Sequence, residues 1–375
     1  MNVLIASDSY KDSLSAFEVG EAARKGTLSA LPSANVENSP MADGGEGTLD
    51  ALLTCLDGEE QEVRVHDPLM NLVVARYVVL NGDTAFIESA RSSGLPLVPF
   101  DKRDPMKANT YGLGEQIKDA VQNGYRKIVI SLGGSATNDG GAGMLQALGW
   151  TFYDEDGSEL GVEGNPMLHA VSFSDRERLP GLEECSFTIA SDVTNPFYGE
   201  KGAAHIFGRQ KGATTEGILE LDAGLVRMAS LFKEAYGVDV QKVAGSGAAG
   251  GLGGSIVAAL NGVLQSGVDT IIELTGLEEK IMKADIIFTG EGSLDQQSLM
   301  GKVPVGVARL AKKHGKKVIG IAGRIDTDLA EVNQYLDAVF SIQTECRSLE
   351  EALRREVTSE QVRVTVEQVV RLLGK

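Results

Sequence analysis

Four short stretches combine hydroxyl and carboxylate side chains, three of them with glycine or proline, and each follows an apolar run typical of a strand. They are Ser7–Ser13 ("SDSYKDS"), Gly133–Gly141 ("GGSATNDGG"), Ser191–Pro196 ("SDVTNP") and Thr289–Asp295 ("TGEGSLD"). In open α/β sheets, ligands bind at the carboxyl ends of strands, where loop amides and helix N-termini converge. Four such stretches in one chain predict a ligand site built from loops that are distant in sequence.

The stretch "GGSATNDGGAG" (Gly133–Gly143) favours the binding of an anion. Glycines let consecutive backbone N–H groups turn inward and form an anion-binding nest. Ser135 and Thr137 add hydroxyls, and the helix expected to follow adds its positive end. The alternative is a helix N-terminal region, with Asn138 or Asp139 as the cap and glycines that allow close packing.

Carboxylates and lysines gather near the same strand ends. The acids are Asp8, Asp43, Glu46, Asp192, Glu291 and Asp295, and the lysines are Lys11, Lys211 and Lys302. Phosphoryl transfer needs positioning, cations on the transferring oxygens and a carboxylate that accepts a hydroxyl proton. These residues could supply Mg²⁺ ligands, a base and positive charge. For any single acid, a capping or turn role remains the alternative.

A second glycine-rich stretch, "AGSGAAGGLGGS" (Ala244–Ser255), contains G-x-G-x-x-G at Gly245, Gly247 and Gly250. A dinucleotide fingerprint needs a strand directly before the first glycine and an acid about 20 residues later at a second strand end. The preceding "VDVQKVA" is a poor strand, and Asp269 lies in a helical pattern. We therefore favour a loop that closes over a phosphate, or a hinge. A nicotinamide-dependent oxidoreductase is the alternative.

The composition narrows the class of protein. A net charge of −18 over 375 residues argues against nucleic acid or an anionic membrane as partner, because phosphate backbones demand a basic face. No stretch approaches the ~18 apolar residues of a membrane span, and the N-terminus lacks the basic lead of a signal peptide. The three cysteines form no metal-binding pattern. We expect a cytoplasmic protein with a small-molecule substrate, which could assemble as a homo-oligomer.

Known catalytic signatures are absent from the sequence. There is no G-x-x-x-x-G-K-[ST], no H-R-D or D-F-G pair of a protein kinase, no G-x-S-x-G and no H-E-x-x-H. These absences argue against a Walker-type NTPase, a protein kinase, a serine hydrolase and a zinc protease.

The expected elements place both chain ends in one sheet. The chain opens with a βαβα pattern, in which Ser15 and Glu18 form a capping box, and Ser348 with Glu351 forms another before the amphipathic helices that close the fold. Strand-like pieces without intervening helices follow from Gln61 to Glu88, and a β/α rhythm resumes near Ala284. This pattern predicts an α/β fold in which residues 1–66 and 284–375 form a doubly wound parallel sheet. Residues 67–283 would form an inserted second α/β domain, with the active site in the cleft between the two domains.

Long motifs of the sequence resemble the glycerate kinase family of bacteria, the type with a Rossmann-like domain and an inserted α/β domain. They are "ASDSYKDSLSA", "PMADGGEGT", "GGSATNDGGAGMLQALG", "SDVTNPFYGEKGA", "FGRQKGAT", "GSGAAGGLGG" and "TGEGSLDQQSLMGKVPVGVA". The resemblance is collinear to at least Ala322.

The resemblance implies ATP-dependent phosphorylation of D-glycerate with Mg²⁺. It favours 2-phospho-D-glycerate as product, with 3-phosphoglycerate as the alternative. The chain departs from the family pattern at Ser7 and Tyr10, where proline and phenylalanine are usual, and we expect these changes to be tolerated. It also has Ser293 where arginine is frequent and Met300 where histidine is frequent.

The site residues follow from this resemblance together with strand-end position and charge. Asp192 is the first choice for the base that accepts the glycerate hydroxyl proton, Asp295 is the second, and Lys11 is the catalytic cation. Asp43, Glu46 and Glu291 are the candidate Mg²⁺ residues. The residues expected to bind substrate or nucleotide are Asp8, Gly133, Gly134, Ser135, Ala136, Thr137, Asn138, Asn195, Lys211, Gly250, Gly251 and Lys302. A non-catalytic two-domain binding protein is a further alternative, which would give no turnover.

Overall fold

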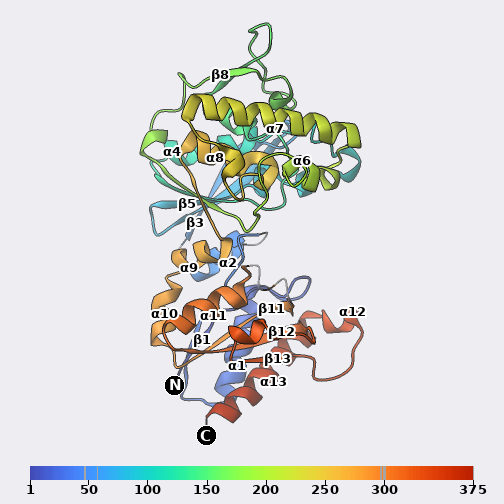
Figure 1. Ribbon diagram of the computed structural model, residues 1–375. Coiled ribbons are helices and arrows are strands. Elements are labelled where there is room, and N and C mark those ends of the chain that lie inside the picture. Colours follow the sequence, from blue (N-terminus) through green and yellow to red (C-terminus); the bar gives the residue numbers. More distant parts are fainter. Residues whose placement is uncertain (46–47, 57, 296–297, 299–300, 375) are drawn as a thin grey trace. The chain divides into compact units, whose positions relative to one another are not determined.

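The computed structural model describes residues 1–45, 48–56, 58–295, 298 and 301–374, and their contacts form two compact units. Unit 1 comprises Met1–Asp57 and Ser266–Lys375, and unit 2 comprises Gly58–Gln265. Both chain ends belong to unit 1 (Figure 1). The α/β class and the inserted unit agree with the sequence-based prediction.

The boundaries between the units differ from the expected ones at residues 66 and 283. Strand β3 (Gly58–His66) pairs antiparallel with β4 (Leu72–Leu80) along its whole length, so β3 belongs to unit 2. Helices α9 (Gly267–Leu274) and α10 (Leu277–Lys283) pack on α11 (Val303–Lys313), so both belong to unit 1. The expected boundaries missed these elements because hydrophobic periodicity identifies a helix or strand but not the sheet that it joins.

Unit 1 is built on a five-stranded, fully parallel sheet in the order β13-β12-β11-β1-β2. The strands are β1 (Asn2–Ile5), β2 (Asn35–Asn38), β11 (Ile286–Leu294), β12 (Lys317–Ile325) and β13 (Ala338–Ser341). Helices α1 (Ala16–Ala30) and α13 (Arg355–Leu373) share one buried cluster with alternate residues of β1, β11 and β12. Helix α11 packs against β11 and β12 without entering that cluster, which puts it over the opposite face. The remaining helices of unit 1 are α2 (Thr48–Cys55) and α12 (Leu349–Ala352).

Two predicted capping boxes fix helix starts in unit 1. Ser15 accepts from the backbone N–H of Glu18, whose carboxylate accepts in return from the N–H of Ser15, and α1 begins at the next residue. Ser348 and Glu351 make the same pair at the start of α12. Both boxes are confirmed, and α12 is a single turn followed by the longer helix α13.

Unit 2 is built on a six-stranded mixed sheet in the order β10-β9-β6-β5-β4-β3. Strands β5 (Thr84–Glu88), β6 (Lys127–Ser131), β9 (Ser186–Ala190) and β10 (Val263–Gln265) are parallel to one another. The helices are α3 (Ala90–Ser93), α4 (Tyr111–Gln122), α5 (Ala142–Ala147), α6 (Ala203–Phe207), α7 (Thr215–Tyr236) and α8 (Ala248–Leu260). Strands β7 (Thr151–Tyr153) and β8 (Ser172–Ser174) form a separate two-stranded sheet. This small sheet lies in the segment between α5 and β9.

The carboxyl ends of the parallel strands define one edge in each sheet. In unit 1 the chain runs from β1 to β2 in one direction and from β11 through β12 to β13 in the other, so the order reverses between β1 and β11. Such a switch point opens a crevice at the strand ends. In unit 2 the last residues of β5, β6 and β9 are in register at Glu88, Ser131 and Ala190. The loops after these strands therefore leave the sheet side by side.

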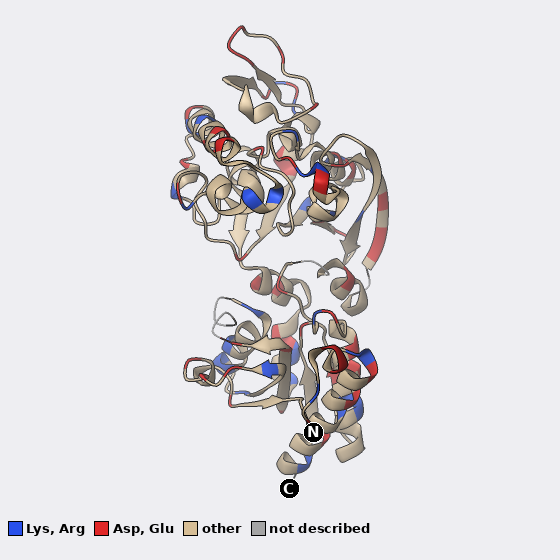
Figure 2. Cartoon of the chain, turned by 90° about the vertical axis from the view of Figure 1, so that its right-hand side faces the viewer, with Lys and Arg blue, Asp and Glu red and all other residues tan. Residues whose placement is uncertain are grey.

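Two further observations concern the distribution of charged residues and the length and polarity of the helices. Acidic and basic residues are interspersed along both units (Figure 2), as expected of a chain that is acidic overall. Within the described ranges, every helix is too short or too polar to cross a bilayer.

Candidate active site

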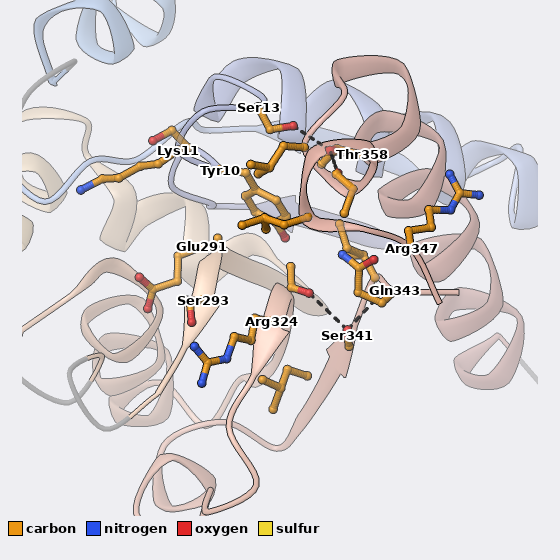
Figure 3. Close-up of a pocket in the computed structure, with 18 of the residues that line it drawn as sticks. Tyr10, Lys11, Ser13, Glu291, Ser293, Arg324, Ser341, Gln343, Arg347 and Thr358 are labelled. Atoms are coloured by element: carbon orange, nitrogen blue, oxygen red, sulfur yellow. Dashed lines mark hydrogen bonds between the residues drawn. The ribbon is translucent and has the colours of Figure 1, made fainter. Parts of the chain in front are cut away.

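A pocket of about 1040 Å³ opens at the carboxyl edge of the unit-1 sheet. We call it the unit-1 pocket. Its lining comes from the loops after β1, β11, β12 and β13 and from α12 and α13 (Figure 3). Five residues that the sequence proposed as functional line it together: Asp8, Lys11, Asp43, Glu291 and Lys302. Asp8 and Glu291 come together because β1 pairs in parallel with β11, and the backbone N–H of Asp8 just after β1 donates to the Gly290 carbonyl at 2.9 Å.

Asp8 lies at the switch point with two further acids nearby. Its carboxylate accepts a hydrogen bond of 2.6 Å from the backbone N–H of Ser9. Burial raises the pKa of Asp8 to about 7, and the negative charges of Asp43 and Glu291 add to this effect. A cation bound at this position would relieve the repulsion and favour the ionised form of Asp8.

Glu291 is held rigidly at the end of β11. Its side chain is buried, and its two oxygens accept from Ser298 Oγ at 2.5 Å and from Lys302 Nζ at 3.0 Å. Burial raises the pKa of Glu291, although both hydrogen bonds favour the charged form. Lys302 also forms the N-cap of α11, so the ion pair ties this helix to β11.

The described candidates for metal binding do not form a complete set of protein ligands. Among the residues that the structure describes, no group of three or more His, Cys, Asp or Glu side chains is arranged to hold a metal ion. The candidate Glu46 lies outside the described residues. Asp43 uses one oxygen to accept from the N–H of Gly45 at 2.9 Å. Mg²⁺ commonly needs only one or two carboxylates when phosphates and water complete its shell.

Asp295, the second candidate base, lies just beyond β11. Its backbone N–H donates to Ser298 Oγ at 3.2 Å, and its carbonyl accepts from the Ser298 N–H at 3.0 Å. Its charge contributes to the raised pKa of Glu291. Asp295 is outside the set of residues that line the unit-1 pocket.

Three polar residues of the pocket were missed in the sequence. Arg324 ends β12 directly beside Ser293 in the register of the sheet, and Gln343 and Arg347 follow β13 (Figure 3). The strands themselves were expected, so their carboxyl ends were a usable signal. These three residues are neither glycine nor acid, the residue types that mark the other strand ends as candidate sites in the sequence. Arg324 thus brings a guanidinium to the strand position next to Ser293.

The departures at Ser7 and Tyr10 have a structural explanation. Ser7 Oγ donates to the carbonyl of Gly290 at 3.1 Å. Tyr10 is buried, and its hydroxyl donates to the carbonyl of Ile321 at 2.8 Å. Burial raises the pKa of Tyr10, so the hydroxyl remains a neutral donor. Both substitutions add a satisfied hydrogen bond at the switch point. Met300 lies outside the described residues.

In unit 2, only the first turn of Gly133–Gly143 retains the features of an anion nest. Gly134 has a positive φ of 63°. The N–H groups of Gly133, Gly134 and Ser135 find no acceptor among the described residues. Ser135 Oγ forms a hydrogen bond of 2.8 Å with Thr137 Oγ1. This turn follows β6 and is the accessible part of the loop.

In the second half of the loop, backbone N–H groups bind a carboxylate of the same loop, that of Asp139. The buried carboxylate of Asp139 accepts from the N–H and hydroxyl of Thr110 and from the N–H groups of Gly141 and Gly143, at 2.7–3.1 Å. A Cβ at Gly143 would lie 2.9 Å from the N of Thr110. Here the structure matches the alternative interpretation, in which Asp139 and glycines serve close packing.

Lys211 supports the same loop from inside the unit. Its side chain is only 2% exposed, and Nζ donates to the carbonyl of Thr137 at 2.6 Å. Burial lowers the pKa of Lys211 to about 8, and the charge of Asp139 acts in the opposite direction. Ala136, Thr137 and Asn138 are buried as well. Lys211 is observed to hold the loop through the Thr137 carbonyl, and a ligand contact by any of these residues stays a prediction.

The second glycine-rich stretch is not a dinucleotide loop. The chain before it forms a 3₁₀ turn (Val240–Lys242) instead of a strand. A Cβ at Gly250, where φ is +74°, would lie 2.2 Å from the Thr137 carbonyl oxygen, and Gly140 donates to the Gly250 carbonyl at 3.0 Å. Gly250 and its neighbour Gly251 therefore allow two loops to pack backbone to backbone. The stretch Gly245–Gly250 therefore gives no structural support to the oxidoreductase alternative.

Asp192 and Asn195 lie in the loop after β9, the neighbour of β6 in the sheet. Asp192 is exposed, and Asn195 Nδ2 donates to the Lys201 carbonyl at 2.8 Å. Because the two strands are parallel and adjacent, this loop leaves the sheet beside the Gly133 turn. The unit-2 edge thus carries a short run of backbone donors and a carboxylate.

Comparison with known proteins gives one consistent result. A model of the glycerate kinase family matches residues 3–374. "Glycerate 2-kinase" of Escherichia coli (strain K12) is 46% identical over 358 residues, which cover 94% of this chain and 93% of the relative. "Glycerate kinase" of Halalkalibacterium halodurans is 42% identical, with coverage of 94% and 93%.

A solved structure extends the similarity to three dimensions. A crystal structure from Salmonella typhimurium LT2, provisionally named glycerate kinase 2, matches with a TM-score of 0.90 and 42% identity. The match covers 100% of this chain and 98% of that chain. The similarity therefore includes both units and the residues of both edges.

Proposed function

Because the chain belongs to the glycerate kinase family, we propose that it transfers the terminal phosphoryl group of ATP to a hydroxyl of D-glycerate. The observation that carries this proposal is the unit-1 pocket. Catalysis of phosphoryl transfer is mainly positioning and charge stabilisation, and the pocket joins acids with Lys11, Lys302 and Arg324 at a switch point.

Magnesium fits the donor set of this pocket. Carboxylate oxygens are hard ligands of the kind that Mg²⁺ prefers, and the metal commonly enters together with the nucleotide phosphates. Asp8 and Asp43 would hold it, and the pKa of about 7 at Asp8 supports this choice because a divalent cation would balance the clustered negative charge. The ion would neutralise charge on the phosphate oxygens.

The lysines and Arg324 would bind the phosphates directly. Lys11 is exposed in the pocket and is free to follow a phosphate oxygen. Lys302 is fixed by its ion pair with Glu291, so its position is set before the nucleotide arrives. A preorganised cation needs little rearrangement as charge develops, which is the arrangement that favours catalysis.

The unit-2 edge is proposed to handle the acid substrate. The N–H groups of Gly133, Gly134 and Ser135 would bind its carboxylate, since backbone donors in a turn with positive φ suit a small anion. Asp192 would accept the proton of the attacking hydroxyl. Both loops leave adjacent parallel strands, which supports their joint action.

We propose 2-phospho-D-glycerate as the product. The support is the name "Glycerate 2-kinase" of the relative from Escherichia coli at 46% identity. Phosphorus NMR of the reaction mixture distinguishes the two products, and a signal of 3-phosphoglycerate would overturn the assignment of the hydroxyl while leaving the kinase activity intact.

The test of the function is a coupled assay of ATP consumption with D-glycerate and Mg²⁺. We expect turnover that requires all three components. Absence of turnover under these conditions would overturn the proposal and favour a binding protein. Titration with NADH serves as a control, because the loop around Gly250 packs against Thr137 and no NADH binding is expected.

A further inference from the structure

The unit-1 pocket has two ends of different chemistry. The ionisable end lies at the switch point and carries the acids and lysines described above. The other end is lined by large apolar side chains from the ends of β12 and β13 and from the region of α12. These are Ile325, Ile342, Leu349, Ala352 and Leu353. The proposed phosphate and metal contacts use the ionisable end and leave the apolar end without a role.

Leu349 marks the apolar end most clearly. Its side chain is 75% exposed although it lines the pocket. The capping box of Ser348 and Glu351 fixes the backbone of the α12 turn that carries Leu349. An exposed large apolar side chain that lines a pocket gains free energy when a ligand covers it.

Polar groups border this apolar end. Gln343 and Arg347 line the pocket from the segment between β13 and α12 (Figure 3). Thr344 of the same segment lines it as well. Arg347 pairs with Glu345, which orients the guanidinium. An apolar surface with a few donors and acceptors at its border is the usual composition of a site for an aromatic heterocycle.

D-Glycerate does not match this surface. It carries a carboxylate and two hydroxyls on three carbons and presents almost no apolar area. The pocket of about 1040 Å³ is also at the upper limit of about 300–1,000 Å³ found for small-molecule sites. A nucleotide has one charged end and one flat, largely apolar end, which are the two properties that this pocket combines.

We propose that the apolar end of the unit-1 pocket binds the nucleobase of the donor nucleotide, with Leu349 against the ring. The phosphates then extend toward Lys302 and Arg324 at the ionisable end. This inference rests on the proposed kinase function and adds to it the subsite that selects a nucleotide over a phosphate donor without a base.

The test compares Leu349→Asp with Leu372→Asp in the full chain. Leu372 on α13 is 73% exposed and lies outside the pocket lining, so it matches Leu349 in residue type and exposure. Calorimetry measures binding of ADP and of inorganic tripolyphosphate, both with Mg²⁺. Thermal unfolding of each variant shows that the fold is retained.

We expect Leu349→Asp to raise the Kd of ADP about tenfold, which corresponds to about 1.4 kcal/mol. Leu372→Asp should leave that Kd within about twofold. The Kd of tripolyphosphate should stay unchanged in both variants, because this probe has no base. The neutral variant Leu349→Ala should weaken ADP in the same direction by a smaller factor, which separates lost contact from added charge.

Three outcomes overturn the inference. Equal weakening of ADP and tripolyphosphate by Leu349→Asp would mean that the substitution acts on the phosphates. Unchanged ADP binding with a raised KM for D-glycerate would assign the apolar end to the acid substrate. Both of these results leave the kinase function standing, whereas a wild-type protein that neither binds ADP nor consumes ATP would overturn the function as well.

Discussion

The carboxyl edges of the two sheets carry similar polar loops, but the carboxylates in these loops have different surroundings. At the unit-1 edge, Asp8, Asp43 and Glu291 crowd together in an open pocket, and burial with like charge raises the pKa of Asp8 to about 7. At the unit-2 edge, the buried carboxylate of Asp139 is surrounded by four donors from its own chain. The comparison shows that a polar, glycine-rich loop can be satisfied internally, whereas three acids that share one open pocket with only two lysines indicate a site for a cation or a substrate.

The same comparison separates two kinds of glycine. Gly134 turns exposed N–H groups outward at the start of its loop, whereas Gly250 has no room for a side chain beside Thr137. Both have positive φ. The function of a glycine therefore depends on what lies within reach of its missing Cβ.

The largest expected effect is on the unit-2 edge. Asp192→Asn keeps the shape of the side chain but removes the proton acceptor, so kcat should fall about 1,000-fold, with little change in the KM of ATP. Steady-state kinetics with both substrates measure this, and Glu200→Gln, an exposed acid after the same loop, is the control. Near-normal turnover of Asp192→Asn would transfer the base role to another carboxylate, with Asp295 next.

A smaller effect is expected from the unit-1 edge. Lys11→Met removes the cation that we propose binds phosphate oxygens, so kcat/KM for ATP should fall about 100-fold. The KM of D-glycerate should change little. A substitution at the unit-2 edge, such as Asp192→Asn, should instead leave the KM of ATP nearly unchanged. Lys25→Met on the exposed side of α1 is the matched control. If Lys11→Met raised only the KM of glycerate, the assignment of the two edges would be reversed.

The pH dependence of activity should report Asp8. Its pKa is raised to about 7, and the cation binds the ionised carboxylate, so kcat/KM for ATP should fall about tenfold per pH unit below pH 7. The folded protein holds the proton that the unfolded chain releases near the ordinary value of 3.8. The contribution of Asp8 to stability is therefore present below that value and is lost as the pH rises to about 7.

Asp8→Asn tests both consequences of this shift. The variant should be less active at all pH values, should lose the acid limb of the kcat/KM profile and should be more stable than the wild type at pH 8. Denaturant unfolding at pH 5 and pH 8 measures the stability. An unchanged acid limb in Asp8→Asn would show that a different group controls the profile.

The smallest effect concerns the packing glycines and is a change of stability. Gly250→Ala and Gly157→Ala both place a side chain at a φ of +74°, but only Gly250 has an atom close by, the Thr137 oxygen at 2.2 Å. Gly157→Ala should cost about 1 kcal/mol for the backbone conformation, and Gly250→Ala about 1–3 kcal/mol more for the clash. Equal losses in urea unfolding would contradict the packing role of Gly250.

The sequence predicted most of the fold because the signals involved are local. Ser15 with Glu18 and Ser348 with Glu351 specify helix starts within four residues of chain, and both starts are observed. Strand ends followed by polar residues marked Asp8, Lys11 and Glu291, and the parallel pairing of β1 with β11 brings them together. The long motifs indicated the family, and the comparisons confirm it.

Other features could not be predicted because they depend on which elements become neighbours. Strand β3 joins unit 2 through its pairing with β4, so the boundary lies before it. Arg324 faces the pocket beside Ser293 only through the register of β11 with β12. The sequence of β11 or of β12 alone does not specify the register in which the two strands pair.

The sequence by itself determined the helix starts, the strand ends and the set of polar residues from which the site is drawn. Tertiary structure decided how each of these polar residues is used. Asp8 and Asp139 are both acids in loops that follow parallel strands, yet one lies among like charges and the other accepts four hydrogen bonds from its own loop and from Thr110. The physical reason is that the state of a carboxylate depends on burial and on the donors and charges around it, and these come from segments far away in the chain.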